Sequence, residues 1–120
     1  MKKSYRVKSE IEFQRVFDNK NSIANKYFII YQLERSQNVH FRVGISVGKK
    51  IGNAVNRNFI KRRIRQVIYH FSDSLKCNID FIVIARPDVN HLSFNEFKKN
   101  LKHVLRIANL FEDDINEKKD

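Results

Sequence analysis

The residues best suited to chemistry in this sequence are cations gathered in one stretch without acidic residues. Between positions 35 and 72 the chain carries nine of its 24 lysines and arginines and no aspartate or glutamate. Such a concentration of positive charge fits a polyphosphate partner, because each neutralised phosphate releases condensed counterions. An anionic membrane surface could use the same charge, but we favour a nucleic acid. The nine are Arg35, Arg42, Lys49, Lys50, Arg57, Lys61, Arg62, Arg63 and Arg65.

Three of these cations form one stripe of a predicted helix. Arg57, Lys61 and Arg65 recur every four residues, and Asn58 and Arg62 flank them. No carboxylate stands three or four positions away to pair with them, and like charges at this spacing repel by a few tenths of a kcal/mol per pair. Arginine also has a planar fork that grips phosphate at two points. The stripe therefore predicts an external anion as its partner.

A second candidate site is aromatic and uncharged. Phe13 and Phe17 lie one helical turn apart, while Tyr27, Ile29 and Tyr31 alternate onto one face of a predicted strand. If these two sets face each other across a groove, unpaired bases can stack there, at about 1 to 3 kcal/mol per base and with little regard to sequence. A phenylalanine pair at helical spacing more often belongs to a hydrophobic core, so the residues by themselves leave both roles open.

The sequence offers no catalytic constellation of its own, and we predict no catalytic residue and no metal ligand in the chain. A nuclease that works through two metal ions needs converging carboxylates, and the basic stretch contains none. The four histidines show no ligand spacing, and a lone cysteine, Cys77, excludes a disulfide framework and a zinc cluster. The glycines do not form a phosphate-binding loop.

Composition bounds the class of protein. The chain has 120 residues, 42% of them hydrophobic, and a net charge of +11, which fits one domain over residues 1–120 with a single core. We expect residues 1–8 and 112–120 to be flexible ends. No apolar run approaches the roughly 20 residues that span a bilayer, and no signal-peptide core follows the polar start. We therefore expect a soluble, cytoplasmic protein with no membrane partner.

Periodicity predicts helices alternating with strands. Capping boxes begin at Ser9 and Ser93, and Asn53 is a plausible N-cap. The predicted fold is α+β, a two-layer sandwich of a small mixed sheet packed with helices in the order α-β-β-α-β-α, with room for an extra short strand. We expect the first two strands to form an antiparallel hairpin. The predicted helices are 9–19, 53–71 and 93–110, and the predicted strands are 27–34, 39–47 and 79–86.

The segment from residue 51 to 65, IGNAVNRNFIKRRIR, resembles the arginine- and asparagine-rich signature of the protein subunit of bacterial ribonuclease P. A glycine, an Ala-Val pair, an Arg-Asn pair and a Lys-Arg-x-x-Arg cluster recur at fixed spacing, preceded by Lys49 and Lys50. Phe59 stands where the family often has a cationic or polar residue, so we expect it to pack. The helix around Phe13, the aromatic strand from Tyr27 and the segment RVGISV from Arg42 also fall where the family has them.

The resemblance implies a ribonucleoprotein in which a large RNA with bound Mg²⁺ is the catalyst. That RNA removes the 5′ leader from precursor tRNA, and the protein is an accessory subunit of this RNA-based endoribonuclease, expected at one protein per RNA and without a DNA partner. It further implies a ribosomal-protein-like fold with a left-handed crossover between parallel strands. The implied contacts with the catalytic RNA are Lys49, Lys50, Asn53, Arg57, Asn58, Lys61, Arg62 and Arg65. The implied leader-binding cleft comprises Phe13, Phe17, Tyr27, Ile29 and Tyr31.

Other functions remain open at this stage. A ribosomal or RNA-chaperone protein would share the size, the charge and the basic helix, but would not support cleavage of precursor tRNA. A self-sufficient nuclease would remain active once all RNA is removed. A reader of duplex DNA is disfavoured, because the stripe offers phosphate-gripping cations and little base-reading variety beyond Asn58.

Overall fold

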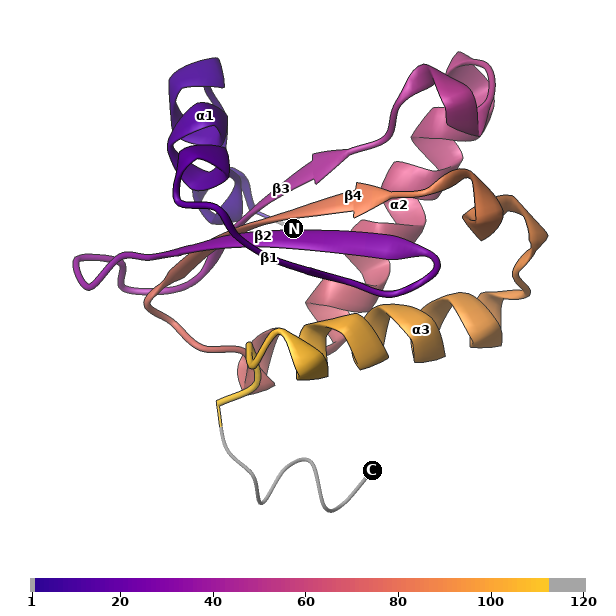
Figure 1. The fold of residues 1–120 in the computed structure, drawn as a ribbon. Coiled ribbons are helices and arrows are strands. Elements are labelled where there is room, and N and C mark those ends of the chain that lie inside the picture. The colour runs from indigo at the N-terminus through magenta and orange to yellow at the C-terminus, as the bar shows by residue number, and fades with distance from the viewer. Residues whose placement is uncertain (1, 113–120) are drawn as a thin grey trace.

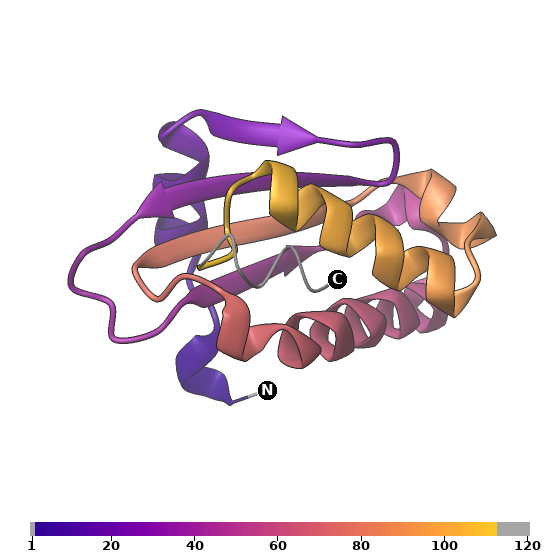
Figure 2. The same ribbon diagram turned by 90° about the horizontal axis from the view of Figure 1, so that it is seen from below.

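The computed structural model describes residues 2–112, which form a mixed four-stranded sheet with three α-helices. Helices α2 and α3 cover one face of the sheet, and α1 stands at one end of the other face (Figures 1 and 2). The α+β class and the predicted order of elements are confirmed, with β1 as the extra short strand. In chain order the elements are α1 (Glu10–Asp18), β1 (Asn21–Ala24), β2 (Phe28–Glu34), β3 (Arg42–Ser46), α2 (Ala54–His70), β4 (Ile79–Ala85) and α3 (Phe94–Ile107).

The predicted hairpin between the strands at 27–34 and 39–47 is wrong. The strands lie in the order β1-β2-β4-β3, and β4 pairs antiparallel with β2 and parallel with β3. Six of the seven residues of β4 are buried, so this strand, apolar except for Asp80, gains most at a central position. The left-handed path of the parallel β3–α2–β4 unit stays a prediction.

The hairpin that does form joins β1 to β2. The side-chain oxygen of Asn25 closes its turn by accepting hydrogen bonds from the N–H groups of Tyr27 and Phe28, each at 2.9 Å. Three of the four residues of β1 are exposed, as suits a short strand at the edge of the sheet.

The helices begin where the sequence predicts. Ser9 and Ser93 each form a complete capping box, and the side chain of Asn53 accepts a hydrogen bond from the N–H of Asn56 at 2.9 Å. These side chains satisfy backbone donors that the first turn of a helix leaves unpaired. Residues close together in sequence therefore determine where each helix begins.

The sheet separates two unequal apolar clusters. Below it, α2 and α3 pack on β2, β3 and β4, and the rings of Phe28 and Phe97 meet edge to face with centroids 5.2 Å apart. Above it, Val16 of α1 is fully buried, but α1 covers one end of the sheet only (Figure 1). Away from α1, the upper face includes Ile29 and Ile84, which are only half-buried.

The N-terminal stretch, expected to be a flexible end, packs beside β3. Residues Lys3–Tyr5 form a 3₁₀ turn, Arg6 makes a parallel bridge with Val43, and Val7 is buried. The N–H of Val7 donates to the carbonyl of Val43 at 3.1 Å. At the other end, residues 113–120 of the predicted flexible tail lie outside the described residues. No helix in the described range is both long and apolar enough to cross a membrane.

Candidate nucleic-acid interface

The loop before α2 is held by asparagine side chains. The side-chain amides of Asn56 and Asn90 both donate to the carbonyl of Ile51, at 3.1 and 2.7 Å, and the Asn56 amide also donates to Asn90 Oδ1 at 3.0 Å. Gly52 has φ 151°, and a Cβ there would come within 2.9 Å of the Asn56 amide nitrogen. Part of the signature therefore builds the turn, and Asn53, predicted to contact RNA, caps the helix.

Helix α2 presents its two sides to different surroundings. Ile60, Ile64, Val67 and Ile68 are buried under the sheet, as predicted. The cations Arg57, Lys61 and Arg65 lie half-buried, whereas Asn58, Arg62, Lys49 and Lys50 are exposed. Within residues 2–112 none of these cations forms an ion pair with a carboxylate.

Positive charges crowd together along the stripe. Burial, and after it the positive charge of Arg6, lower the pKa of Arg65 from its ordinary value. The Nε atoms of Arg6 and Arg57 are buried, and no hydrogen-bond partner for them exists in the described part of the chain. The sequence does not place Arg6 beside the stripe, because this residue lies far from the signature in the chain.

Phe59 and Arg63 lie within the signature, but their side chains contact each other, and that of Arg63 also contacts α3. The guanidinium of Arg63 lies 4.6 Å from the centroid of the Phe59 ring and 5.4 Å from that of Phe94 on α3. Cations over aromatic faces are attracted by the ring quadrupole. Arg63 therefore faces α3 rather than joining the stripe. Phe59, expected to pack, is 40% exposed, and its ring face contacts Arg63.

Within residues 2–112, two cations of the acid-free stretch have carboxylate partners. Arg42 donates to the carboxylate of Asp80 through Nε at 3.0 Å and Nη2 at 2.6 Å, and Arg35 lies 3.7 Å from the same carboxylate. Asp80 is only 1% exposed and also accepts from Asn38 at 2.8 Å. The interpretation of all nine cations as a polyphosphate surface is corrected by this network, which uses Arg35 and Arg42 inside the protein.

The same network anchors α1. Arg42 Nη1 donates to Glu12 at 2.7 Å, and the other oxygen of Glu12 accepts from the N–H groups of Lys8 and Ser9 at 3.1 and 3.3 Å. Burial by itself would raise the pKa of Glu12, but these hydrogen bonds outweigh it and lower the pKa to about 2. We call Arg35, Arg42, Asp80 and Glu12 the internal ion network; it fixes one wall of the open face.

Ring contacts join part of the predicted cleft. The centroids of Phe17 and Tyr31 are 4.9 Å apart in an edge-to-face contact, and those of Phe13 and Phe17 are 6.4 Å apart. Phe13 lies directly over Gly44, where a Cβ would come within 2.6 Å of its ring. Glycine at this position allows α1 to approach β3.

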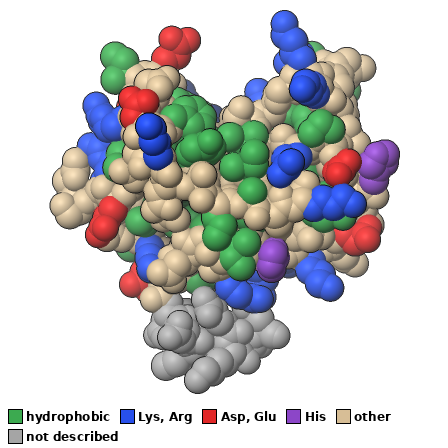
Figure 3. Space-filling view, viewed as in Figure 1, with side chains coloured by type: hydrophobic (Ala, Val, Ile, Leu, Met, Phe, Trp, Pro, Cys, Tyr) green, Lys and Arg blue, Asp and Glu red, His purple; other side chains and the backbone are tan. Residues whose placement is uncertain are grey.

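The floor of the cleft is the upper face of the sheet. Ile29 is half-buried there and pairs with Ile84 of β4. Tyr27 precedes β2 at the end of the sheet away from α1, and no ring contact joins it to Phe13 or Phe17 in the described range. Figure 3 shows the hollow between α1 and the start of α2, with hydrophobic side chains on its floor and Lys and Arg side chains on the α2 side.

The described residues contain no group of three or more His, Cys, Asp or Glu side chains that could hold a metal ion. Within the same residues, one surface is a row of cations without carboxylate partners and the other is an apolar, aromatic floor. Cations of this kind suit phosphates, and exposed rings suit bases.

Comparison with known proteins decides the family. The family model described as Ribonuclease P matches residues 1–109. The chain belongs to the ribonuclease P protein family. It is 54% identical to the ribonuclease P protein component of Levilactobacillus brevis over 98% of this chain and 99% of that protein. It is 58% identical to the same component of Enterococcus faecalis over 93% and 95% of the two chains.

The fold agrees with this assignment. The solved structure of the Staphylococcus aureus RNase P protein matches with a TM-score of 0.84 at 41% identity, over 90% of this chain and 98% of that one. As a member of the family the chain is an accessory subunit of a tRNA-processing endoribonuclease and associates with ribonuclease P RNA and precursor tRNA. The resemblance read from the signature is confirmed, and the ribosomal and RNA-chaperone alternatives are not supported.

Proposed function

We propose that the chain binds the catalytic RNA along α2 and the 5′ leader of precursor tRNA in the cleft above the sheet. The observation that carries the proposal is the contrast in partners: within the described residues the cations of α2 have no carboxylate, whereas Arg35 and Arg42 of the same stretch do. A protein gains nothing in its own stability from a row of unpaired like charges. The row is explained by a polyanion that binds it.

On α2 the expected contacts are with phosphates and sugars. Arg57, Arg62 and Arg65 supply planar forks, and Lys61 supplies a point charge. Lys49 and Lys50, exposed in the turn that precedes α2, extend the row toward the cleft. Asn58, exposed beside the stripe, adds one amide, while Asn53 serves the helix cap.

In the cleft the chemistry is different, because the leader differs from one precursor to the next. Phe13, Phe17 and Tyr31 offer rings on which any base can stack, and Ile29 extends the apolar floor. Tyr27 stands apart from this ring cluster, so we propose a role for it only at the far end of the leader.

Mg²⁺ belongs to the RNA in this proposal. The metal ions held by the catalytic RNA supply the chemistry of hydrolysis, and the chain neutralises phosphates where catalytic and substrate RNA approach each other. Fewer free Mg²⁺ ions are then needed to offset the repulsion between the two RNAs. We place one such protein on each catalytic RNA, in the cytoplasm.

Reconstitution tests the proposal. The chain is mixed with the catalytic RNA at a Mg²⁺ concentration too low for the RNA alone, and cleavage of precursor tRNA is measured. We expect cleavage with the intact chain and a higher Mg²⁺ requirement with Arg65→Ala. The matched control is Lys99→Ala, which removes one exposed positive charge from α3. Equal effects of the two variants would contradict a specific role for α2.

A further inference from the structure

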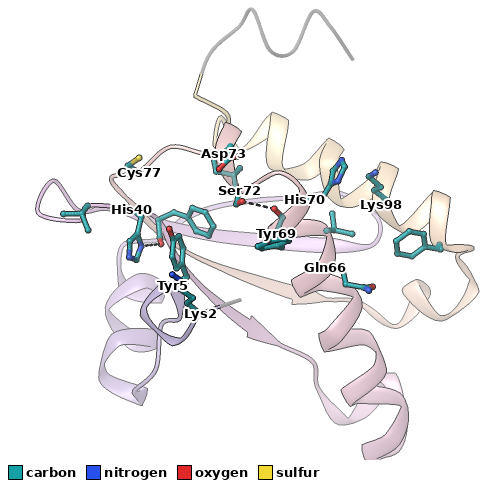
Figure 4. A pocket seen from close by; sticks show the side chains of 15 residues that line it. Lys2, Tyr5, His40, Gln66, Tyr69, His70, Ser72, Asp73, Cys77 and Lys98 are labelled. Atoms are coloured by element: carbon teal, nitrogen blue, oxygen red, sulfur yellow. Dashed lines mark hydrogen bonds between the residues drawn. The ribbon is translucent and has the colours of Figure 1, made fainter.

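A cavity of about 1000 Å³ lies beside the C-terminal half of α2, away from the cleft. Its walls come from the N-terminal turn, the loop before β3, the end of α2 and the start of α3 (Figure 4). None of the five predicted cleft residues lines it. The function proposed above makes no use of this cavity.

The walls are unusually aromatic. The rings of Tyr5 and His40 stack with centroids 3.7 Å apart and planes 11° apart. Tyr69, on α2, is 68% exposed and has no ring partner within residues 2–112. Figure 4 shows Tyr69 between the Tyr5–His40 pair and His70, and Lys2 and Lys98 also line the cavity. Flat rings open to solvent beside cations are the features with which proteins hold unpaired bases.

Tyr69 also continues the cationic stripe. It follows Arg65 by four residues, as Arg65 follows Lys61, and so lies on the same face of α2 about 6 Å further along the helix axis. In the same way Gln66 and His70 continue the row that begins with Asn58. An RNA strand whose phosphates follow the stripe therefore reaches the aromatic cavity at its next nucleotide.

We propose that this cavity binds an unpaired nucleobase of the catalytic RNA, with Tyr69 as the stacking platform. The proposal rests on the RNA-binding role proposed for α2. Gln66 and the carboxylate of Asp73 line the cavity and can accept hydrogen bonds from an exocyclic amino group. We place the base against Gln66 and Asp73, and the backbone phosphates toward Lys2 and Lys98, which also line the cavity. Adenine, cytosine or guanine is then preferred to uracil, which has no exocyclic amino group.

The first test measures the affinity of the catalytic RNA, without substrate, for four variants, one of which is Arg65→Ala in the stripe. Tyr69→Ala removes the platform and is expected to weaken binding about 5- to 100-fold, the range for loss of one stacked base. Tyr69→Phe keeps the ring and should bind within about twofold of the unchanged chain. Ile107→Ser alters an exposed apolar residue of α3 outside the cavity and should have no effect. Because Tyr69 is exposed, thermal unfolding should be unchanged by its replacement.

The outcomes separate this inference from the proposed function. If Tyr69→Ala binds normally while Arg65→Ala binds weakly, the cavity proposal is overturned and the α2 interface stands. If both bind normally, the α2 interface itself fails. Equal losses for Tyr69→Phe and Tyr69→Ala would show that stacking is not the cause.

A spectroscopic test identifies the occupant. The chain has no tryptophan, so Tyr69→Trp places a single indole in the cavity. Catalytic RNA and oligoadenylate should quench its emission, oligouridylate less, and a blunt RNA duplex hardly at all. Quenching only by a precursor that carries a leader would assign the cavity to the substrate, and quenching that rises with protein concentration alone would assign it to a second copy. Either result overturns the proposal.

Discussion

Arg42 and Arg65 are half-buried arginines from the same acid-free stretch, and their surroundings are opposite in charge. Hydrogen bonds to Asp80, and then to Glu12, outweigh burial and raise the pKa of Arg42, whereas burial and the charge of Arg6 lower that of Arg65. The fold supplies carboxylates to Arg42 from β4 and α1, and supplies none to Arg65 in the described residues. Arginine content by itself therefore does not distinguish the two; they differ in whether residues 2–112 supply a carboxylate partner.

Replacing Arg42 should have the largest effect on stability. Arg42→Ala leaves the buried carboxylate of Asp80 without its two-point partner, which costs about 3 to 5 kcal/mol when one member of a buried pair is removed. Arg65→Ala should change the free energy of unfolding by less than about 0.5 kcal/mol, because residues 2–112 supply no carboxylate partner that the change would remove. Urea unfolding measures the free energy of unfolding of both variants. Similar losses of stability would contradict the difference between Arg42, which has carboxylate partners, and Arg65.

Gly44→Ala tests how closely α1 approaches the sheet. The new Cβ would come within 2.6 Å of the Phe13 ring, and the internal ion network holds α1 in place. We expect a loss of about 1 to 3 kcal/mol in stability, as for other overpacked sites, and weaker discrimination between precursor and mature tRNA. Gly48→Ala is the control, since nothing lies within 4 Å of a Cβ there. Equal stability of Gly44→Ala and Gly48→Ala would contradict the close contact between Phe13 and Gly44.

The capped helices, the signature and the cationic stripe could be predicted because each depends on residues close together in sequence. The strand order could not, because β4 separates β2 from β3 only when the whole sheet assembles, and β1 has no apolar alternation to mark it. The internal ion network joins Glu12, Arg42 and Asp80, which are distant in the chain. Tyr69 continues the stripe visibly in the sequence, but the cavity beside it depends on the N-terminal turn that packs against β3.

The salt dependence of binding to the catalytic RNA tests whether Arg65 contacts a phosphate. Removing one cation that touches a phosphate lowers the slope of log affinity against log salt concentration by about 0.7 to 0.9. Arg65→Ala should flatten the slope for the catalytic RNA by roughly that amount, and Lys99→Ala should leave it unchanged. An unchanged slope for Arg65→Ala would mean that its guanidinium touches no phosphate.

The pH dependence of stability should report the internal ion network with a smaller effect. Glu12 has a pKa of about 2 in the fold against an ordinary 4.5. Because its pKa is lowered on folding, its stabilisation is complete above about pH 5 and is lost as the pH falls towards 2. The thermal midpoint of the unchanged chain should therefore fall more steeply over this window than that of Glu12→Gln. Parallel curves for the two proteins would contradict the role of Glu12.

We propose that the two RNA partners bind two different surfaces of the protein, and one pair of variants tests this separation. For Arg65→Ala and Phe17→Ala, the affinity for the catalytic RNA and the holoenzyme's preference for precursor over mature tRNA are both measured. We predict that Arg65→Ala weakens the first and spares the second, while Phe17→Ala spares the first and reduces the second. If both variants weaken both quantities alike, or if the preference is independent of leader length in every case, the separation of the two surfaces is wrong.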